Sequence, residues 1–373
     1  MKRKNLLTLF GSICLVLVLA ALLLPACAKE APAPPAPAPP VAPVPKPPAP
    51  APPKPAPTPA PPAPTVWTPE KPITVIIPWK AGGGTDLYAR IAAPHWQKYM
   101  PGKEPFIMVN KPGGGGVIGT TAIYMAKPDG YTIGLTIPLS MIINQLVSEV
   151  GYDMRKFEIL GGPCVYKRTI FTNPETVPEI KTWEEALARI YDLKVGTYGY
   201  GGTSHLAPLL HGYLTGQFDP GKVNFVHYSG TSGLVAGFQR KEVDIYWGAI
   251  EAHKKYADEG IMTTLLVFSD ATHELCPEIP TTVEAGIPKA KEMNASLYDP
   301  KVFIAPPGTP KIVVDTLAEA LARALDDPTC LADGEKAKKP IEALSAEEMK
   351  KFVDDGVVTW SKQTEIIELL KKG

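Results

Sequence analysis

The stretch IPWKAGGGTD, residues 77–86, closes an apolar run with three glycines and a polar pair, after which the pattern becomes helical. Backbone amides at such a strand-to-helix junction are unpaired and lie at the positive end of the helix dipole, so they favour an anion. Glycine also allows a ligand to come close to the main chain. The alternative is a tight turn between strand and helix that binds nothing.

A second glycine run, NKPGGGGVIG at residues 110–119, follows the next expected strand and opens the next expected helix. Because adjacent parallel strands end at the same edge of a sheet, the two loops should lie side by side where ligands usually bind. We therefore expect them to grip one anionic group. For Asp86, favouring the helix dipole or pairing with Arg90 are structural alternatives. The candidate binding residues of the two loops are Trp79, Gly83, Gly84, Thr85, Asp86, Gly115 and Gly116.

The glycine runs do not carry a nucleotide-binding motif. Gly114, Gly116 and Gly119 match GxGxxG, but no acidic residue ends the following strand to hold a ribose. No Gly-Lys-Ser/Thr follows either run, so the phosphate-binding loop of nucleotide hydrolases is excluded. Histidine, cysteine and acidic residues show no metal-ligand spacing. We expect neither a cofactor nor a metal.

The N-terminus predicts export from the cytoplasm. Three positive charges precede an apolar run from Leu6 to Leu24, and small residues with a cysteine follow. Residues 24–27, Leu-Pro-Ala-Cys, resemble the lipobox of bacterial lipoproteins, which implies a signal peptide at 1–26 and lipidation of Cys27. The alternative is an uncleaved anchor with an unmodified thiol, since about 20 apolar residues span a bilayer. Either way we expect an extracytoplasmic chain tethered to a membrane, at the cell surface or in the periplasm.

Residues 27–68 predict a disordered linker rich in proline and alanine. Within 31–64, 19 of 34 positions are proline, which lacks the amide donor and holds the backbone near polyproline II. Such a segment cannot build a core and should act as a semi-rigid spacer of roughly 100 Å, at about 3.1 Å per residue. A ligand for a proline-recognising domain is the alternative interpretation.

Charge and cysteine content favour a small-molecule role. Removing the three signal-peptide cations from 38 Lys and Arg leaves 35 against 38 Asp and Glu, so the sequence implies no basic face for nucleic acid. Beyond the N-terminal segments the cysteines are Cys164, Cys276 and Cys330, and their spacing does not say whether two of them form a disulfide.

The remaining 300 or so residues suffice for two α/β lobes. Short β-branched and aromatic runs alternate with helical patterns, which is typical of parallel sheets with covering helices. Capping boxes at Thr182 and Ser345 mark two helix starts. We expect strands at 73–78, 105–110, 131–137, 193–199, 223–228, 243–250 and 263–269, and helices at 85–99, 116–126, 203–214, 310–327 and 346–371.

A third junction, residues 202–205, follows the strand at 193–199 and should place another amide cluster across a cleft. Its candidate binding residues are Gly202, Thr203, Ser204 and His205. Asp244 could contact the ligand or close the cleft, or it could simply cap a turn. Ser204, His205 and Asp244 also supply the residue types of a hydrolase triad. Adjacent residues on a helix point about 100° apart, however, and no GxSxG elbow is present, so we expect no enzyme.

In order and spacing, these segments resemble the solute-binding proteins of tripartite tricarboxylate transporters, also called the Bug family. The resemblance covers about 300 residues, and its matching segments are 72–86, 110–116, 128–132, 202–206, 227–230, 242–244, 279–281, 284–286 and 305–310.

The resemblance implies a two-lobed α/β fold similar to type II periplasmic binding proteins, which close by a hinge on a small carboxylate and deliver it to membrane permease subunits. It further implies that loops 82–86 and 113–116 hold one carboxylate through main-chain amides and water. Neither loop contains arginine, so affinity would come from dipoles and hydrogen bonds. Trp79, Gly115 and His227 depart from the residues commoner in the family, and the long linker is atypical, which leaves the ligand undefined.

We expect domain I at 70–170 plus 300–373 and domain II at 171–299, in a monomer. The ligand could be a dicarboxylate, a tricarboxylate, an aromatic acid or an amino acid, because Trp79, Tyr198, Tyr200 and His205 could line an aromatic-friendly pocket. A protein that senses the same ligand for a receptor kinase is the alternative to a transport role.

Overall fold

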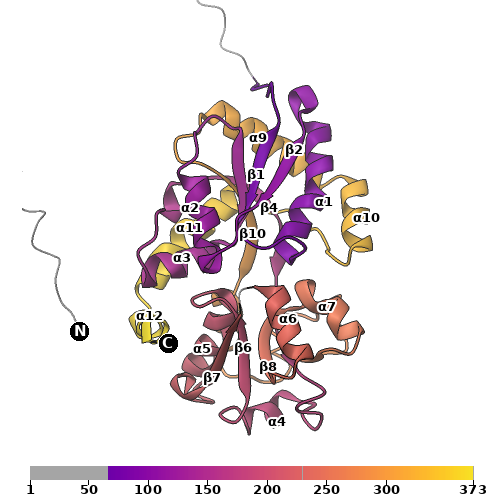
Figure 1. Ribbon diagram of the computed structural model, residues 1–373, viewed down its shortest axis with the longest axis vertical. Helices are drawn as coiled ribbons and strands as arrows, with labels where there is room; N and C mark the ends of the chain where they lie inside the picture. The colour runs from indigo at the N-terminus through magenta and orange to yellow at the C-terminus, as the bar shows by residue number, and fades with distance from the viewer. Residues whose placement is uncertain (1–65, 229, 373) are drawn as a thin grey trace, which may run out of the picture. The chain divides into compact units, whose positions relative to one another are not determined.

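Two five-stranded sheets, each covered by helices, make up the part of the chain that the computed structural model describes, residues 66–228 and 230–372 (Figure 1). The predicted signal peptide at 1–26, the lipidation site Cys27 and all but the last three residues of the predicted linker lie outside the described residues. Within the described part, no helix combines the length and apolarity needed to cross a bilayer.

The first sheet has the strand order β2-β1-β3-β10-β4. β1 pairs in parallel with both β2 and β3, whereas β10 runs antiparallel to β3 and β4. The strands alternate with helices along the chain until β4, and β10 then returns to the sheet from far downstream. The bounds are β1 (Ile73–Ile77), β2 (Phe106–Asn110), β3 (Thr132–Thr136), β4 (Glu158–Tyr166) and β10 (Asp299–Ala305).

The second sheet repeats this topology in the order β7-β6-β8-β5-β9. β6 pairs in parallel with β7 and β8, and β5 runs antiparallel to β8 and β9. Each sheet therefore has four strands that run in one direction and one, β10 or β5, that runs antiparallel to them, where the sequence predicted parallel sheets only. The bounds are β5 (Arg168–Thr172), β6 (Lys194–Tyr198), β7 (Asn224–Tyr228), β8 (Ile245–Ala249) and β9 (Thr263–Val267).

The three strands that the sequence analysis missed are those of the crossings between the sheets. β4 contains Gly-Gly-Pro, which usually argues against a strand, but β4 lies at the edge of the sheet beside β10, where proline is tolerated. β10 carries Pro300 as its second residue, close to the strand start. β5 is short and follows β4 after a single residue, Lys167, so no turn signal separates the two strands.

Helices cover both faces of each sheet. Both predicted capping boxes are present. The side chains of Thr182 and Ser345 each accept a hydrogen bond from the amide of the glutamate three residues later, and that glutamate's carboxylate accepts one from the backbone amide of the capping residue. The bounds are α1 (Gly84–Tyr99), α2 (Val117–Tyr124), α3 (Pro138–Val147), α4 (Trp183–Leu187), α5 (Thr203–Thr215), α6 (Thr231–Gln239), α7 (Ile250–Asp258), α8 (Ala290–Ser296), α9 (Lys311–Leu325), α10 (Pro328–Lys336), α11 (Ala346–Ser361) and α12 (Thr364–Lys372).

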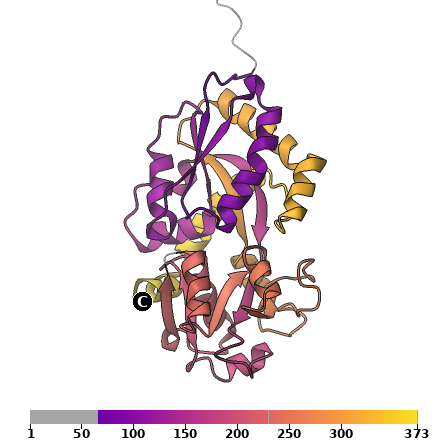
Figure 2. The same cartoon turned by 45° about the vertical axis from the view of Figure 1, so that its right-hand side comes forward.

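The C-terminal helix joins the two lobes. The helix expected at 346–371 is interrupted at Lys362 and Gln363, and the break lets α12 pack against α3 of the first lobe and α5 of the second. Figure 2 shows α12 (yellow) beside the second lobe. Ile366 and Leu370 are fully buried there, in a hydrophobic cluster that also holds Leu206 of α5. A continuous apolar core therefore runs from one lobe into the other.

Ile366→Ala tests this bridging role. Removal of a fully buried isoleucine side chain should lower the free energy of unfolding by about 2–5 kcal/mol, measured by urea denaturation. Val358→Ala, in the neighbouring helix α11 with a side chain that is half exposed, is the control and should change it by about 0.5 kcal/mol or less. Equal effects of the two substitutions would contradict the role assigned to α12.

Candidate functional site

A cavity of about 360 Å³ lies between the two lobes, at the carboxyl ends of their parallel strands. The first lobe contributes both glycine loops, and the second contributes the ends of β6 and β7 with part of α7. Its principal lining residues are Pro78–Thr85, Leu87, Pro112–Gly116, Ile137, Tyr166 and Lys339 from the first lobe, and Tyr198, Gly199, Tyr228, Gly230, Thr231, Ser232, Ala252, Lys255 and Tyr256 from the second.

Asp86 braces the first glycine loop from behind. Its carboxylate accepts hydrogen bonds from the amide of Gly82 at 2.8 Å, from Nε of Arg90 at 2.9 Å and from Nδ2 of Asn110 at 3.0 Å. Burial would raise the pKa of Asp86, but these hydrogen bonds outweigh it and hold the pKa below its ordinary value. Asp86 is buried and does not line the cavity, so its role is to shape the loop. Gly84 and Thr85 in the first turn of α1 do line the cavity, and amides in a first turn have no acceptor within the helix.

The second loop depends on glycine for its backbone. All four residues from Gly113 to Gly116 have positive φ, with 62° at Gly115 and 105° at Gly116, a region that other residues adopt only with strain. A Cβ atom at Gly116 would lie 2.8 Å from Cζ2 of Trp79, so the indole ring packs directly on this loop. Trp79 thus joins the two glycine loops into one wall.

Tyr166, the last residue of β4, places an unpaired hydroxyl group at the first turn of α1. Tyr166 lines the cavity and is 4% exposed, and its buried Oη atom has no hydrogen-bond partner. A Cβ atom at Gly84 would lie within 2 Å of this oxygen, so only glycine leaves room for it. Burial raises the pKa of Tyr166 well above its ordinary value, so the hydroxyl stays protonated and can donate.

The second lobe presents a different helix start from the one expected. Gly230, Thr231 and Ser232 at the beginning of α6 line the cavity, together with Tyr228 at the end of β7. Residues 202–205 at the start of α5 do not line it. The amide of Thr203 instead donates to Oγ of Ser140 in α3 at 3.2 Å, so this helix start is used to hold the two lobes together.

Ser204, His205 and Asp244 serve three separate backbone sites. Oγ of Ser204 accepts the amide of Tyr198, Nδ1 of His205 accepts the amide of Gly201, and Oδ2 of Asp244 accepts the amide of Lys194. Burial, with a contribution from His227, lowers the pKa of His205 to about 3, so its ring is neutral.

Asp244 precedes β8 and accepts a hydrogen bond at the start of β6. Tyr198, which lines the pocket, stands at the other end of β6, so Asp244 lies away from the pocket. The expectation that Gly202–His205 and Asp244 contact a ligand is therefore corrected, and Asp244 takes its alternative role as a residue that caps local backbone.

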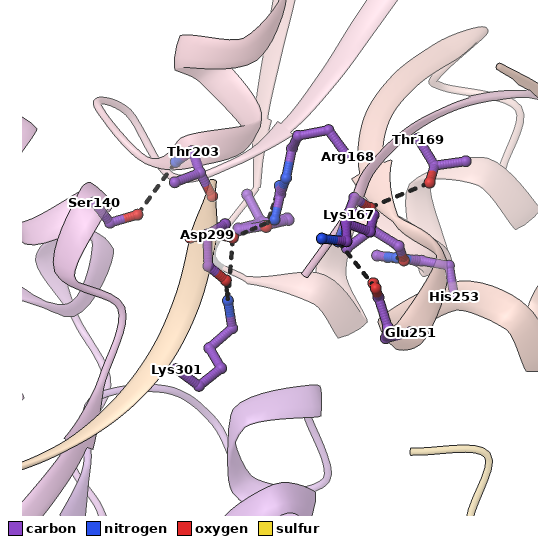
Figure 3. Close-up of polar contacts among 11 residues, drawn as sticks. Ser140, Lys167, Arg168, Thr169, Thr203, Glu251, His253, Asp299 and Lys301 are labelled. Carbon is purple, nitrogen blue, oxygen red and sulfur yellow. Dashed lines mark hydrogen bonds and ion pairs between the residues drawn. The ribbon is translucent and has the colours of Figure 1, made fainter. Parts of the chain in front are cut away.

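A buried charge cluster holds the crossings between the lobes. Arg168 at the start of β5 and Lys301 in β10 both pair with Asp299, and all three side chains are fully buried (Figure 3). Arg168 also donates to Oη of Tyr198 at 3.2 Å, and Nζ of Lys301 lies 3.7 Å from the ring centre of Tyr166. Burial alone would lower the pKa of Arg168, but Tyr198 and Asp299 raise it. Tyr166 and Tyr198, which both line the pocket, therefore contact this charge cluster directly.

The cysteines and potential metal ligands form no site among the described residues. Cys164, Cys276 and Cys330 are buried free thiols. In the same part of the chain, no group of three or more His, Cys, Asp or Glu side chains could hold a metal ion.

The sequence matches the family described as "Tripartite tricarboxylate transporter family receptor" over residues 89–371. The chain belongs to this family. The match spans both sheets and begins just after the first glycine loop. Members of the family are binding proteins, so the hydrolase alternative is set aside.

Individual relatives agree with this assignment. The chain is 27% identical over 311 residues to Protein BugT of Bordetella pertussis, covering 79% of this chain and 88% of BugT. The structure of the periplasmic binding protein BugD has a TM-score of 0.71 and 25% identity, covering 81% of this chain and 99% of BugD. MatC from Rhodopseudomonas palustris, solved with malate, shares the fold at 22% identity with a TM-score of 0.67, covering 80% of this chain and 99% of MatC. The two-lobed fold expected from the sequence is confirmed.

The sequence analysis identified one lobe of the pocket better than the other. Of the candidate residues, Trp79, Gly83, Gly84, Thr85, Gly115 and Gly116 line the cavity, and so does Tyr198, whereas Asp86, Tyr200 and His205 do not. Tyr228 and Gly230 lay within a family-like segment whose role was not deduced. Tyr166, Tyr256 and Lys339 carried no sequence signal, because each reaches the pocket only through tertiary packing.

Gly84→Ala tests the contact with Tyr166. The new methyl group would overlap the tyrosine oxygen, so we expect the free energy of unfolding to fall by about 1–3 kcal/mol. Tyr166→Phe in the same chain should recover part of this loss because it removes the oxygen. Gly83→Ala is the neighbouring control and should cost less than about 1 kcal/mol, since its φ is −75°. Absence of any rescue would contradict the contact.

His205 should make stability depend on pH. The folded protein keeps the ring neutral down to about pH 3, whereas the unfolded chain binds the proton near its ordinary pKa of about 6.5. The unfolded state thus holds more protons between these values, and stability falls as pH falls through this window. When the pH is lowered from 7.5 to 5, the free energy of unfolding should fall by on the order of 2 kcal/mol less in His205→Asn than in the wild type, measured by urea denaturation at both pH values. Parallel pH profiles would refute the assignment.

Proposed function

We propose that this chain is an extracytoplasmic receptor that captures a small organic carboxylate and delivers it to a membrane transporter of the tripartite tricarboxylate type. One observation carries the proposal: both glycine loops and Tyr166, whose buried hydroxyl group has no partner, line a single cavity between two lobes. Family membership and the malate bound to the structurally similar MatC support a carboxylate as the ligand.

In this proposal, the carboxylate binds at the first turn of α1. The first-turn amides and the Tyr166 hydroxyl donate to its oxygens, and the α1 dipole favours the negative charge. Loop 113–116 closes the same end of the cavity. From the second lobe, the start of α6 at Gly230–Ser232 meets the other end of the ligand. Binding therefore relies on backbone dipoles from both lobes, and the ligand is released unchanged.

Closure would be a hinge motion about the two crossings. The first crossing consists of Lys167 alone between β4 and β5, and the second enters β10 at Asp299. Tyr166 and Asp299 are direct partners in the β4–β10 ladder, so the two crossings lie side by side. The domain limits of 70–170 plus 300–373 and 171–299 fit these positions to within a few residues and are part of the proposal.

The location follows from the N-terminal segments. A lipid on Cys27 would hold the protein at the membrane, and the proline-rich linker would let the receptor reach permease subunits in the same membrane while it works as a monomer.

Isothermal titration of the purified protein against mono-, di- and tricarboxylates and aromatic acids tests the proposal. At least one carboxylate should bind, and at 100 times its Kd it should raise the free energy of unfolding by roughly 2.7 kcal/mol. Tyr166→Phe should weaken that ligand about tenfold or more, because a hydrogen bond to a charged group is lost. Tyr152→Phe is the control, since this buried hydroxyl donates to the Met141 carbonyl outside the pocket.

A second pair of variants separates the loop from general backbone strain. Gly115→Ala and Gly216→Ala introduce a side chain at nearly the same backbone conformation, with φ of 62° and 65°, but only Gly115 lines the pocket. We expect binding to weaken in Gly115→Ala and to persist in Gly216→Ala. Binding of neutral solutes or nucleotides with no carboxylate bound would overturn the proposed function.

A further inference from the structure

The charged side chains that line the pocket are all of one sign. Lys80, Lys255 and Lys339 belong to the lining, and no Asp or Glu does among the described residues. Nζ of Lys339 is held by the carbonyl oxygens of Glu251 and Lys338, at 2.5 and 3.3 Å, which fixes a buried ammonium group in the wall. The cavity therefore offers cations and dipole-oriented amides, and no anion for a cationic part of a ligand.

Asp86 and Glu251, the acids in the first turns of the wall-forming helices α1 and α7, have other partners. Asp86 is held by Gly82, Arg90 and Asn110, as described above. Glu251, in the first turn of α7, accepts the amide of Lys167 at 2.9 Å and faces Nε2 of His273 at 3.2 Å. Neither residue lines the cavity, so neither carboxylate can pair with a ligand ammonium group there.

Five aromatic residues also line the pocket. Trp79 and Tyr166 come from the first lobe, and Tyr198, Tyr228 and Tyr256 come from the second. Aromatic residues thus line both sides of the cleft, where a flat apolar group could stack on them. A cavity of about 360 Å³ is at the lower end of the range of about 300–1,000 Å³ typical of small-molecule sites.

We infer that the ligand is an aromatic carboxylic acid without an ammonium group. The inference rests on the proposed function and deepens it by naming the ligand class. An amino acid would bring an ammonium group into a pocket with three lysines and no carboxylate, where it would be repelled and would have no anion to pair with. Aromatic cages do bind quaternary ammonium ions, but the lysines in this wall oppose that use.

Isothermal titration with two matched ligand pairs tests the inference. 3-Phenylpropanoate differs from phenylalanine, and succinate from aspartate, only by the α-amino group. We expect each deaminated acid to bind at least tenfold more tightly than its amino partner. We also expect 3-phenylpropanoate to bind at least tenfold more tightly than succinate, because only the former fills the space between the rings. Glycine betaine, which probes an ammonium-binding cage, should not bind.

A pair of tyrosine variants tests the stacking directly. Tyr256→Ala should weaken 3-phenylpropanoate about three- to tenfold while leaving succinate nearly unchanged. Tyr191→Ala removes a tyrosine that is 48% exposed and does not line the cavity, and it should affect neither ligand.

The outcomes separate this inference from the proposed function. If no carboxylate binds in any titration, the proposed function fails and the inference with it. If carboxylates bind but phenylalanine equals 3-phenylpropanoate, glycine betaine binds, or succinate is the tighter acid, only the inference is overturned.

Discussion

The buried ion pair between Arg168 and Asp299 is the interaction on which the arrangement of the two lobes depends. Both side chains are fully excluded from solvent, and they stand at the first residues of β5 and β10, where the chain crosses between the sheets. Removing one partner of such a pair leaves an uncompensated buried charge, which typically costs about 3–5 kcal/mol. Lys301 adds a second cation to Asp299, so the two crossings are locked side by side.

This charge cluster is coupled to the pocket through two tyrosines. Tyr198 accepts a hydrogen bond from Arg168, and Tyr166 lies under the ammonium group of Lys301, while both rings line the cavity. A ligand that contacts these rings therefore touches side chains packed on the hinge. Because the two sheets share one topology, their carboxyl edges also face each other across the same crossings, and helix starts from both lobes meet at one cavity.

Recognition in this pocket is divided between backbone and side chains. The glycine loops offer amides whose positions are set by positive φ angles and by the bracing carboxylate of Asp86. Such a grip suits any carboxylate and carries little information about the rest of the molecule. The rings and lysines around it differ in kind, because in the proposed function they would select the ligand by shape and charge. Members of one family can thus keep the loops and change their ligand by changing the surrounding wall.

Local sequence by itself determined the strand-to-helix junctions, the capping boxes at Thr182 and Ser345, and the two glycine loops, because each depends on residues close together in the chain. Tertiary structure alone decided which junction of the second lobe lines the cavity. The starts of α5 and α6 both follow strands. The Thr203 amide in α5 donates a hydrogen bond to Ser140 of the opposite lobe, whereas the start of α6 lines the pocket. Tyr166 and Lys339 likewise join the site from positions far apart in sequence, since packing across the hinge, and no local pattern, brings them there.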